Sequence, residues 1–500
     1  MYFKESMSTP DKSTLKAVKA EESKKLAAPS AHDDNHRYNR YHIETKPAPD
    51  IVPYPSRFLV KVKKIGLARL ILKELFHYRA NMPVILSRPC VYGVFSGPIG
   101  GFAPRPQLCV GCLRCTTKYP EFVQIYPNPE RQRLGDSYFT SSYVDTVTSE
   151  AQTGRIPVKG AGYRGKFGGE GWDGMWTDMS EIVRPTRDGI HGREFISTVA
   201  DIGEKLSYLT FDEAGLPTGV IPRTLEIPLP ILLDVSPAMA APKTLLPIFS
   251  QAAREIEILF VAPLSAVREL GLSGRQVVPL IAPEDRALLG SLSFQPTMIE
   301  LAGWNEKLYQ EVRSRFPESI VCPRLGFAEG FAETLRTSYQ AGVRVFHLTA
   351  NYHGRGSDGR FVLDLIREAH LTFVEAGCRD KVTLIGSGGI IAAEHVPKAI
   401  ICGLDAVALD TALLVALQGK MLGECLDNAT SRFEMPNIPM EWGVQRLKNL
   451  MATWRDQLLE IMGAMGMREV RRLRGEIGRA MFQKDLEQEA FAGITGYANS

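Results

Sequence analysis

The second half of the chain alternates short apolar runs with amphipathic segments, and this alternation constrains the fold more than any other feature. Eight runs are rich in β-branched or other apolar residues: 231–235, 258–263, 277–283, 298–302, 320–325, 343–349, 382–386 and 406–410. Segments typical of helices lie between them, notably at 243–256, 304–316, 328–341, 360–378, 392–402 and 411–422. Apolar strands that are each followed by a crossover helix predict a parallel sheet buried on both faces. Eight such strands in about 200 residues are the number that closes a (β/α)8 TIM barrel.

An open doubly wound α/β sheet is the main alternative for this alternation. In that fold the first strand leads into a G-x-G-x-x-G turn. Here the first run is followed by Ser236-Pro237-Ala238-Met239, which lacks the glycines. We therefore predict an α/β chain whose TIM barrel spans residues 226–427.

The segments that flank the predicted barrel differ from it in composition. Residues 1–55 mix Lys, Glu, Ser, Pro and Ala with little apolar periodicity, which predicts a disordered N-terminal arm. Residues 56–225 are rich in Gly, Pro and aromatic residues, which predicts a loop-rich region around a cysteine cluster. Residues 428–500 predict a C-terminal helical extension. The helices expected there cover 447–462 and 467–491.

Two parts of the loop-rich region stand out. Residues 58–77 place apolar side chains at helical spacing with lysines and arginines between them, which predicts a basic amphipathic helix. This helix would either pack on the next domain or dock to a partner or a membrane surface. The segment Gly160–Gly192 contains nine glycines, and it would either wrap a site or form a tightly turned structural lid.

Charge and hydropathy exclude some classes of function. The chain has 59 Lys and Arg residues against 56 Asp and Glu residues, and a formal net charge of +3 gives no reason to expect a nucleic-acid partner. No apolar run reaches the roughly eighteen residues that a membrane span needs, and the N-terminus MYFKESMSTP lacks the apolar segment of a secretory signal. We therefore expect a cytoplasmic protein that acts on a small-molecule substrate.

Three of the eight cysteines lie close together, which favours cofactor ligation over disulfides. Cys109, Cys112 and Cys115 follow the iron–sulfur spacing C-x2-C-x2-C-x3-C-P, but Tyr119 occupies the fourth cysteine position. With a remote fourth ligand, for which Cys90 is the nearest candidate, the run would hold a [4Fe–4S] cluster; without one it would hold a [3Fe–4S] cluster. A zinc site and a degenerate structural remnant are the alternatives, although zinc sites usually need a second cysteine pair.

The seventh apolar run ends in the most informative turn of the predicted barrel. Ser387, Gly388 and Gly389 follow it, and glycines at such a position let main-chain N–H groups turn toward a bound anion. In TIM barrels the loops after strands seven and eight form the common phosphate site. Thr411, at the start of the helix after the eighth run, would supply the second half of that site. A tight structural turn is the alternative.

Asp410 lies directly before that helix and conflicts with a phosphate site. A carboxylate about 4 Å from a phosphate costs on the order of 4 kcal/mol per charge pair at an effective dielectric near 20. As a helix N-cap, Asp410 would also accept from the N–H groups that a phosphate would otherwise use. Either the phosphate is bound mainly by the turn at Gly388 and Gly389, or the pocket no longer binds a phosphate.

Two other predicted strand ends carry residues suited to catalysis. Arg324, at the end of the fifth run and shortly before Glu329, could hold a carboxylate or another anionic group. His353 follows the sixth run, and it could donate to a carbonyl or move a proton. An ordinary hydrogen-bonded histidine in a glycine-flanked loop is the alternative.

Residues 225–480 resemble the FMN-binding domain of glutamate synthase, especially its archaeal-type and glutamate-synthase-related members. The resemblance is carried by RLGFAEG, HLTANYHGRG and LIGSGGIIAAEHVPKAIICGLDAVALDTALLVALQGKMLGEC, and the tail GAMGMREVRRLRG is similar to the helical end of that domain. The run CVGCLRC is similar to the ferredoxin-like insert of the archaeal forms.

The resemblance implies an FMN-dependent oxidoreductase that carries out the reductive amination of 2-oxoglutarate or of a similar small carbonyl or imine. It implies electrons delivered through an iron–sulfur cluster, and an electron-donor protein or a glutaminase subunit as partner. By position it implies catalytic roles for Arg324, Glu329 and His353. The cofactor-binding residues that it implies are Ser387, Gly388, Gly389, Thr411, Gly354 and Gly356.

Three departures from the family pattern affect the substrate more than the flavin. Met1 is followed by Tyr2, so no N-terminal nucleophilic cysteine begins a glutaminase domain. Cys425 has no companion cysteines downstream, so the family's three-iron motif after strand eight is missing. Asp410 stands where the family usually has glycine. The alternatives are therefore an FMN-barrel oxidoreductase of another substrate, such as a 2-hydroxy acid or an isoprenoid, and a non-catalytic barrel that serves as a scaffold or electron-transfer subunit.

Overall fold

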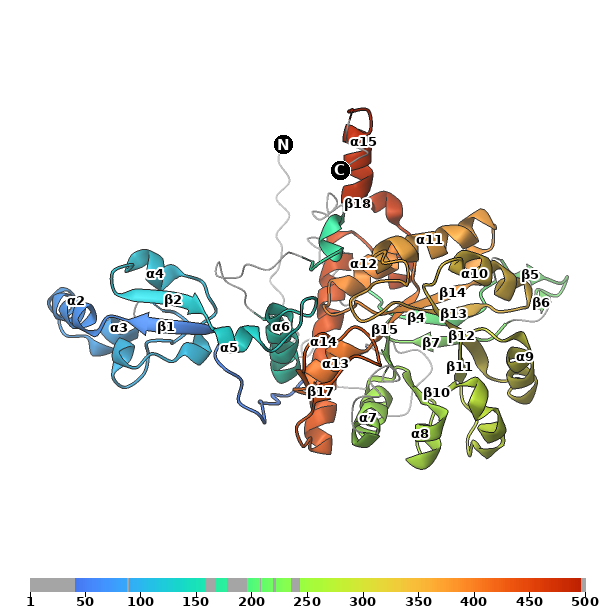
Figure 1. Ribbon diagram of the computed structural model, residues 1–500, viewed down its shortest axis with the longest axis horizontal. Helices are drawn as coiled ribbons and strands as arrows, with labels where there is room; N and C mark the ends of the chain where they lie inside the picture. Colours follow the sequence, from blue (N-terminus) through green and yellow to red (C-terminus); the bar gives the residue numbers. More distant parts are fainter. Residues whose placement is uncertain are drawn as a thin grey trace, which may run out of the picture. The chain divides into compact units, whose positions relative to one another are not determined.

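Eight parallel strands form a closed barrel in the computed structural model (Figure 1). The structure describes residues 41–87, 90–157, 168–177, 196–206, 208–218, 222–234 and 243–495. The barrel strands are β8 (Ile231–Asp234), β9 (Phe260–Pro263), β10 (Val277–Ile281), β11 (Met298–Ala302), β12 (Ile320–Gly326), β13 (Val345–Thr349), β14 (Thr383–Ser387) and β15 (Ala406–Leu409). Strand β15 pairs with β8 and closes the ring. The prediction of a (β/α)8 barrel is confirmed.

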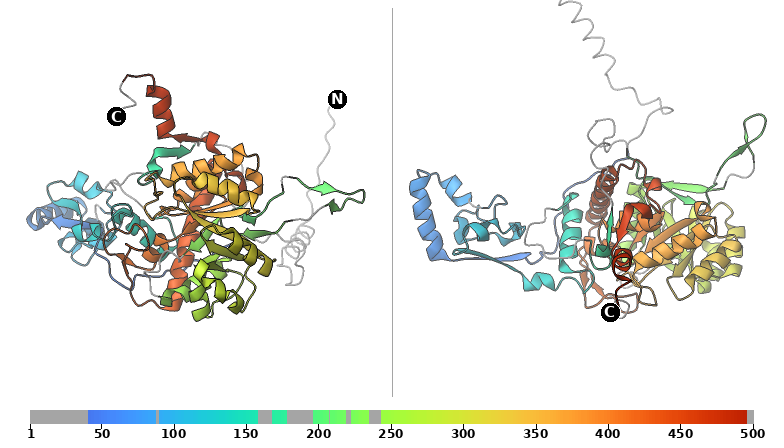
Figure 2. Two further views of the ribbon diagram at one scale, coloured as in Figure 1. Left: turned by 45° about the vertical axis from the view of Figure 1, so that its right-hand side comes forward. Right: turned by 90° about the horizontal axis from the view of Figure 1, so that it is seen from above.

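Helices surround the strands of this barrel (Figure 2). They are α7 (Leu246–Ile256), α8 (Leu264–Glu269), the 3-10 helix η6 (Pro283–Ser291), α9 (Glu306–Arg315), α10 (Phe331–Gln340), α11 (Val362–Glu375), α12 (His395–Cys402) and α13 (Thr411–Ala416). The strands are apolar at nearly every position because one face lines the barrel interior and the other contacts these helices. All five residues of β14, for example, are buried.

The last barrel helix and the C-terminal region differ from the prediction. The helix predicted over 411–422 ends at Ala416, and Lys420–Met421 form a short strand, β16, that pairs with β17 (Phe433–Glu434). Most of the helix predicted over 467–491 is absent, because Gly475 adopts a φ of 71° and the chain turns there. The observed elements are α14 (Met440–Ala464), β18 (Ala480–Phe482), which pairs with β3 (Met175–Thr177), and α15 (Gln483–Phe491).

The cysteine-containing module precedes the barrel in the chain. It consists of β1 (Phe58–Val62), α2 (Lys64–His77), α3 (Met82–Ser87), α4 (Arg114–Lys118) and β2 (Val123–Pro127), followed by α5 (Pro129–Gln132). The prediction of one helix over 58–77 is wrong at its start, because β1 pairs antiparallel with β2. Phe58, Val60 and Val62 alternate along β1 and pack against an apolar cluster that includes two cysteines. That period of two is typical of a strand with one covered face.

Helix α6 (Ser141–Thr153) packs against α14 beside the barrel. Residues 42–55 of the predicted arm run along these two helices: the Ala48 amide donates to Gln152 O at 2.8 Å, and the Arg446 guanidinium donates to Ala48 O at 3.0 Å. No helix in the described ranges combines the length and the apolar character of a membrane span. The remaining strands form two hairpin-like pairs, β4 (Ala200–Gly203) with β7 (Thr224–Ile227) and β5 (Thr210–Phe211) with β6 (Pro217–Thr218).

Candidate functional site

A chain of buried polar side chains crosses the barrel near the carboxyl ends of its strands. Arg324 on β12 contacts Asp234 on β8 through Nη1 at 3.0 Å and Glu300 on β11 through Nη2 at 2.7 Å. The other oxygen of Glu300 lies 2.9 Å from Nδ1 of His347 on β13, and His347 Nε2 lies 3.0 Å from Ser387 Oγ on β14. This chain, named here the barrel network, links five strands and ends at the predicted phosphate turn.

The charges of the barrel network depend on one another. Burial by itself would raise the pKa of Glu300, but Arg324 and His347 outweigh burial and lower this pKa to about 2. Burial by itself would lower the pKa of the Arg324 guanidinium, but the carboxylates of Asp234 and Glu300 outweigh burial and raise this pKa. Arg324 therefore stays charged, and its charge is already balanced by two buried carboxylates.

The turn after β14 is enclosed by protein. Gly388 and Gly389 have φ values of 91° and 73°, which favour glycine. A Cβ on Gly388 would lie 2.5 Å from Ala350 O, and a Cβ on Gly389 would lie 2.5 Å from the Cα of Gly354. Both glycines are thus required by the close approach of the loop after β13.

Aromatic side chains from before the barrel cover this turn. The Tyr138 hydroxyl donates to Gly389 O at 2.6 Å, and Trp172 Nε1 donates to the same oxygen at 2.9 Å. Trp172 also stacks on His395 of α12. Trp172 belongs to the glycine-rich segment, whose described part, 168–177, thus contacts the turn; whether the segment wraps a site or forms a structural lid stays a prediction. Residues 160–167 and 178–192 lie outside the described residues.

The main-chain donors of the turn are its most informative feature. Gly388, Gly389 and Ile390 are buried, and the amide of none of them has an acceptor among the residues that the structure describes. The next amide, that of Ile391, donates to His395 Nδ1 at 3.2 Å. Because buried amides are almost always paired, three consecutive unpaired ones indicate a site for an acceptor that is not part of the described chain.

Asp410 acts as the N-cap of α13, as predicted. Its carboxylate accepts from the amide of Thr411 and, at 3.0 Å, from the hydroxyl of the same residue. Burial raises the pKa of Asp410; the bonds from Thr411 oppose this shift and the charge of Asp234 adds to it, so that the pKa reaches about 7. Both donors of Thr411 are therefore engaged within the chain.

The other predicted site residues lie outside the barrel network. His353 lies 3.0 Å from Asp136 Oδ2 through Nε2 and stacks on the ring of Tyr138. Glu329 is exposed in the loop between β12 and α10, and no partner for its side chain exists among the described residues. Gly354 packs on Gly389, whereas Gly356 is half-buried and donates to Arg360 O at 3.0 Å.

The predicted metal ligands lie together in the cysteine module. Cys109 and Cys115 are buried, with exposures of 5% and 6%, and Cys112 and Cys90 are half-buried. Burial raises the pKa of the Cys109 thiol, and the neighbouring cysteines raise it further. In the apoprotein this favours the neutral thiol, so the thiolates that metal ligation needs would form as the metal binds.

Sequence reasoning missed several residues of the site. Asp234, Glu300 and His347 all lie within predicted strands, where each is a titratable residue in an otherwise apolar run. A polar residue inside a buried strand must find a partner, and this signal could have identified them. No local pattern pointed to Tyr138.

Comparisons with known proteins find several similar chains. The family model for the conserved region in glutamate synthase matches residues 355–468. The archaeal glutamate synthase [NADPH] of Methanocaldococcus jannaschii is 36% identical over 124 residues, which are 23% of this chain and 24% of that protein. The archaeal-type glutamate synthase [NADPH] of Dehalococcoides mccartyi is 22% identical over 437 residues, which are 74% of this chain and 86% of that protein. A solved mandelate oxidase variant with a monooxide FMN adduct aligns with a TM-score of 0.36 and 16% identity, over 56% of this chain and 87% of that chain.

Fold and site together define a (β/α)8-barrel protein with a turn after its seventh strand in which three consecutive buried amides have no acceptor among the described residues. The matched family region contains that turn. Residues 355–468 match the conserved region in glutamate synthase, and 74% of the chain is similar, at 22% identity, to an archaeal-type glutamate synthase [NADPH].

The barrel network predicts a stability effect. Glu300→Gln should lower the free energy of unfolding by about 3 kcal/mol, because it removes one of the two buried carboxylates that balance Arg324 and the carboxylate that pairs with His347. Urea unfolding followed by tryptophan fluorescence measures this change. Glu333→Gln is the matched control, since this exposed carboxylate lies 3.5 Å from Arg336 and its loss should cost about 0.5 kcal/mol or less. Equal effects of the two substitutions would contradict a supporting role for Glu300.

Proposed function

We propose that this chain is a cytoplasmic FMN-dependent oxidoreductase of the glutamate-synthase type, which reduces the imine of 2-oxoglutarate or of a similar small carbonyl compound. The observation that carries the proposal is the turn after β14, with its three consecutive buried amides that lack an acceptor among the described residues. Amides of this kind bind phosphate groups, and the loop after strand seven is a common phosphate site in such barrels. The names of the relatives support the reaction type.

The residues at the turn fit the phosphate of FMN only in part. The amides of Gly388, Gly389 and Ile390 are available to it. The Ser387 hydroxyl contacts His347, and the donors of Thr411 are bound by Asp410. The first half of the predicted phosphate site therefore fits the group, whereas the predicted contact from Thr411 would require Asp410 to release it.

The proposed reaction balances as a two-electron reduction. 2-Oxoglutarate and ammonia lose water to form an imine, which needs two electrons and two protons to become glutamate. When bound, FMN would receive two electrons from a donor protein and supply them to the imine carbon as a hydride. Cys109, Cys112 and Cys115 would hold the iron–sulfur cluster through which these electrons enter. Ammonia would be taken up free or from a separate glutaminase subunit.

The charges and contacts of the polar residues near the barrel mouth indicate which class of substrate the site could bind. Arg324 remains our candidate for binding an anionic group, but Asp234 and Glu300 already balance its charge. Glu329 and His353 remain candidate catalytic residues, although Glu329 is exposed and His353 is held by Asp136. The balanced charge of Arg324 favours a second candidate, an FMN-barrel oxidoreductase of a less anionic carbonyl compound or 2-hydroxy acid.

Flavin affinity tests the cofactor assignment. We predict that the apoprotein binds FMN at least about 100-fold more tightly than riboflavin, because each charge-assisted hydrogen bond to the phosphate contributes about 1.5 kcal/mol or more. Quenching of flavin fluorescence on titration measures both affinities. Equal affinities would remove the phosphate site at Gly388, and absence of binding would support the non-catalytic alternative.

The substrate is tested with the reduced flavoprotein under anaerobic conditions. For the proposed function, 2-oxoglutarate with ammonium should reoxidise the bound flavin, and 2-oxoglutarate alone should not. The second candidate predicts reoxidation by other carbonyl compounds, or bleaching of the oxidised flavin by 2-hydroxy acids.

Asp410 should make flavin binding depend on pH. With a pKa of about 7 its carboxyl is neutral below that pH and charged above it, so repulsion of the phosphate should appear as the pH rises through 7. We predict that Asp410→Asn binds FMN about as well as the wild type at pH 5.5 and about tenfold more tightly at pH 8.5. Glu333→Gln, which removes the same charge from an exposed position, should match the wild type at both pH values. A constant ratio between Asp410→Asn and the wild type would contradict this role.

A further inference from the structure

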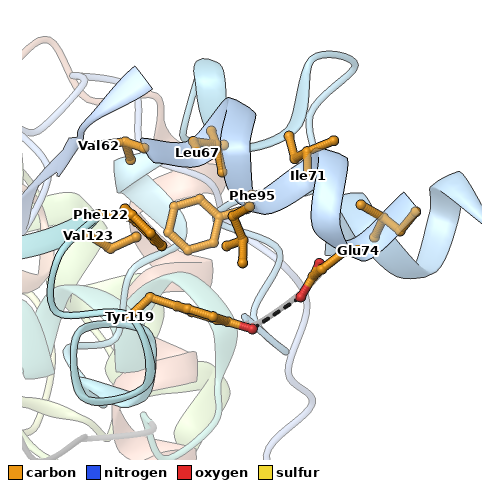
Figure 3. A pocket seen from close by; sticks show the side chains of 11 residues that line it. Val62, Leu67, Ile71, Glu74, Phe95, Tyr119, Phe122 and Val123 are labelled. Carbon is orange, nitrogen blue, oxygen red and sulfur yellow. Dashed lines mark hydrogen bonds between the residues drawn. The ribbon is translucent and has the colours of Figure 1, made fainter. Parts of the chain in front are cut away.

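Tyr119, which occupies the fourth position of the cysteine run, makes a hydrogen bond elsewhere in the module. The Tyr119 hydroxyl donates to Glu74 Oε1 on α2 at 3.2 Å. Figure 3 shows the Tyr119 side chain directed at Glu74, along an apolar pocket that Leu67 and Phe122 also line. The run Cys109–Cys115 therefore offers three thiols, and any fourth ligand must come from elsewhere in the chain.

Cys90 lies next to these three cysteines although it precedes them by about twenty residues. It packs against the apolar cluster that contains Cys109 and Cys115. Cys109 and Cys115 are members of that cluster, and Cys112 lies between them in the chain. Cys90 and the three cysteines of the run therefore belong to one part of the module.

The spacing of the four sulfur atoms distinguishes between kinds of metal site. Among the described residues, no three of these cysteines have their sulfur atoms all within 4.8 Å of one another. A tetrahedral zinc ion with bonds of about 2.3 Å would hold its sulfur ligands roughly 3.8 Å apart. In a cubane cluster each thiolate binds a different iron, so the sulfur atoms lie further apart. The absence of such a compact trio among the described cysteines argues against a preformed zinc site.

The backbone around the cysteines offers donors to a cluster. Gly111 and Leu113 have φ values of 71° and 57°, so the chain winds tightly between the cysteines. A Cβ on Gly111 would lie 2.4 Å from Cζ of Phe58, which requires glycine there. Several amides of this loop have no acceptor among the residues that the structure describes: those of Val110, Cys112, Leu113 and Arg114. Amide donors to cluster and cysteine sulfur atoms are a regular feature of iron–sulfur sites.

We propose that Cys90 is the fourth ligand of a [4Fe–4S] cluster, with Cys109, Cys112 and Cys115 as the other three. Only the role of the cluster, which is the entry of electrons, rests on the function proposed above; the assignment of Cys90 as a ligand does not. It favours a four-iron over a three-iron site, because a fourth thiol packs against the apolar cluster that contains Cys109 and Cys115. The ligand comes from the loop after α3, so the cluster would join this loop to the loop before α4.

The test is cluster reconstitution of the full chain with iron and sulfide under anaerobic conditions. Iron, sulfide and FMN per chain are assayed together, and the cluster is identified by electron paramagnetic resonance before and after reduction. The wild type should bind about four irons and show a signal only after reduction, as expected for a [4Fe–4S] cluster. Cys90→Ser should lose about one iron per chain and show the signal of an oxidised [3Fe–4S] cluster, with unchanged FMN content. Cys90→Asp, whose carboxylate can bind iron, should retain more of the fourth iron than Cys90→Ser.

Cys378→Ser is the matched control, since Cys378 is a buried cysteine next to the barrel strand β14 and should not affect iron content. Cys112→Ser should lose the whole cluster while it keeps FMN. Wild-type iron content and spectra in Cys90→Ser would overturn the proposal, as would binding of one zinc per chain or no metal in the wild type. If the wild type binds four irons and no flavin, the proposed oxidoreductase function fails while the assignment of Cys90 stands.

Discussion

The barrel network is the interaction on which the candidate site depends. Arg324 holds two buried carboxylates from β8 and β11, and Glu300 passes this constraint to His347 and from there to Ser387. Each group is desolvated, and each is stable only because its neighbours compensate its charge or its lost hydrogen bonds with water. Ser387 is the last residue before the two glycines, so the network fixes the strand end from which the turn departs.

Contacts with the loop after β13 and with two aromatic side chains hold that turn in place. Its glycines pack on the backbone of the loop after β13, and Tyr138 and Trp172 occupy the carbonyl of Gly389. The carbonyl is thereby satisfied, whereas the amides of the turn have no acceptor among the described residues. Asp410 competes with a phosphate for the second half of the site. This arrangement favours an anion that is bound by the amides of the turn after β14 and not by Thr411.

Some elements of this structure could be predicted from the sequence and others could not, for different physical reasons. The eight strands were predictable because residues buried on both faces are apolar at nearly every position, as in β14, and the N-cap role of Asp410 followed from its place before an apolar helix. Strand β1 was missed because the apolar Leu59 on its exposed face obscures the alternation, and the following helix continues the mixture of apolar and basic residues. Arg324 and Ser387 were predicted as site residues, but their partners Asp234, Glu300 and His347 were missed because they are far apart in the chain and only the barrel's closure brings them together.

A crystal structure of the protein loaded with flavin tests the central claim most directly. The account predicts FMN at the carboxyl ends of the strands, with phosphate oxygens within hydrogen-bonding distance of the amides of Gly388, Gly389 and Ile390. It also predicts an unchanged contact between His347 and Ser387. A phosphate bound elsewhere, with these three amides paired to protein groups or water, would contradict the account.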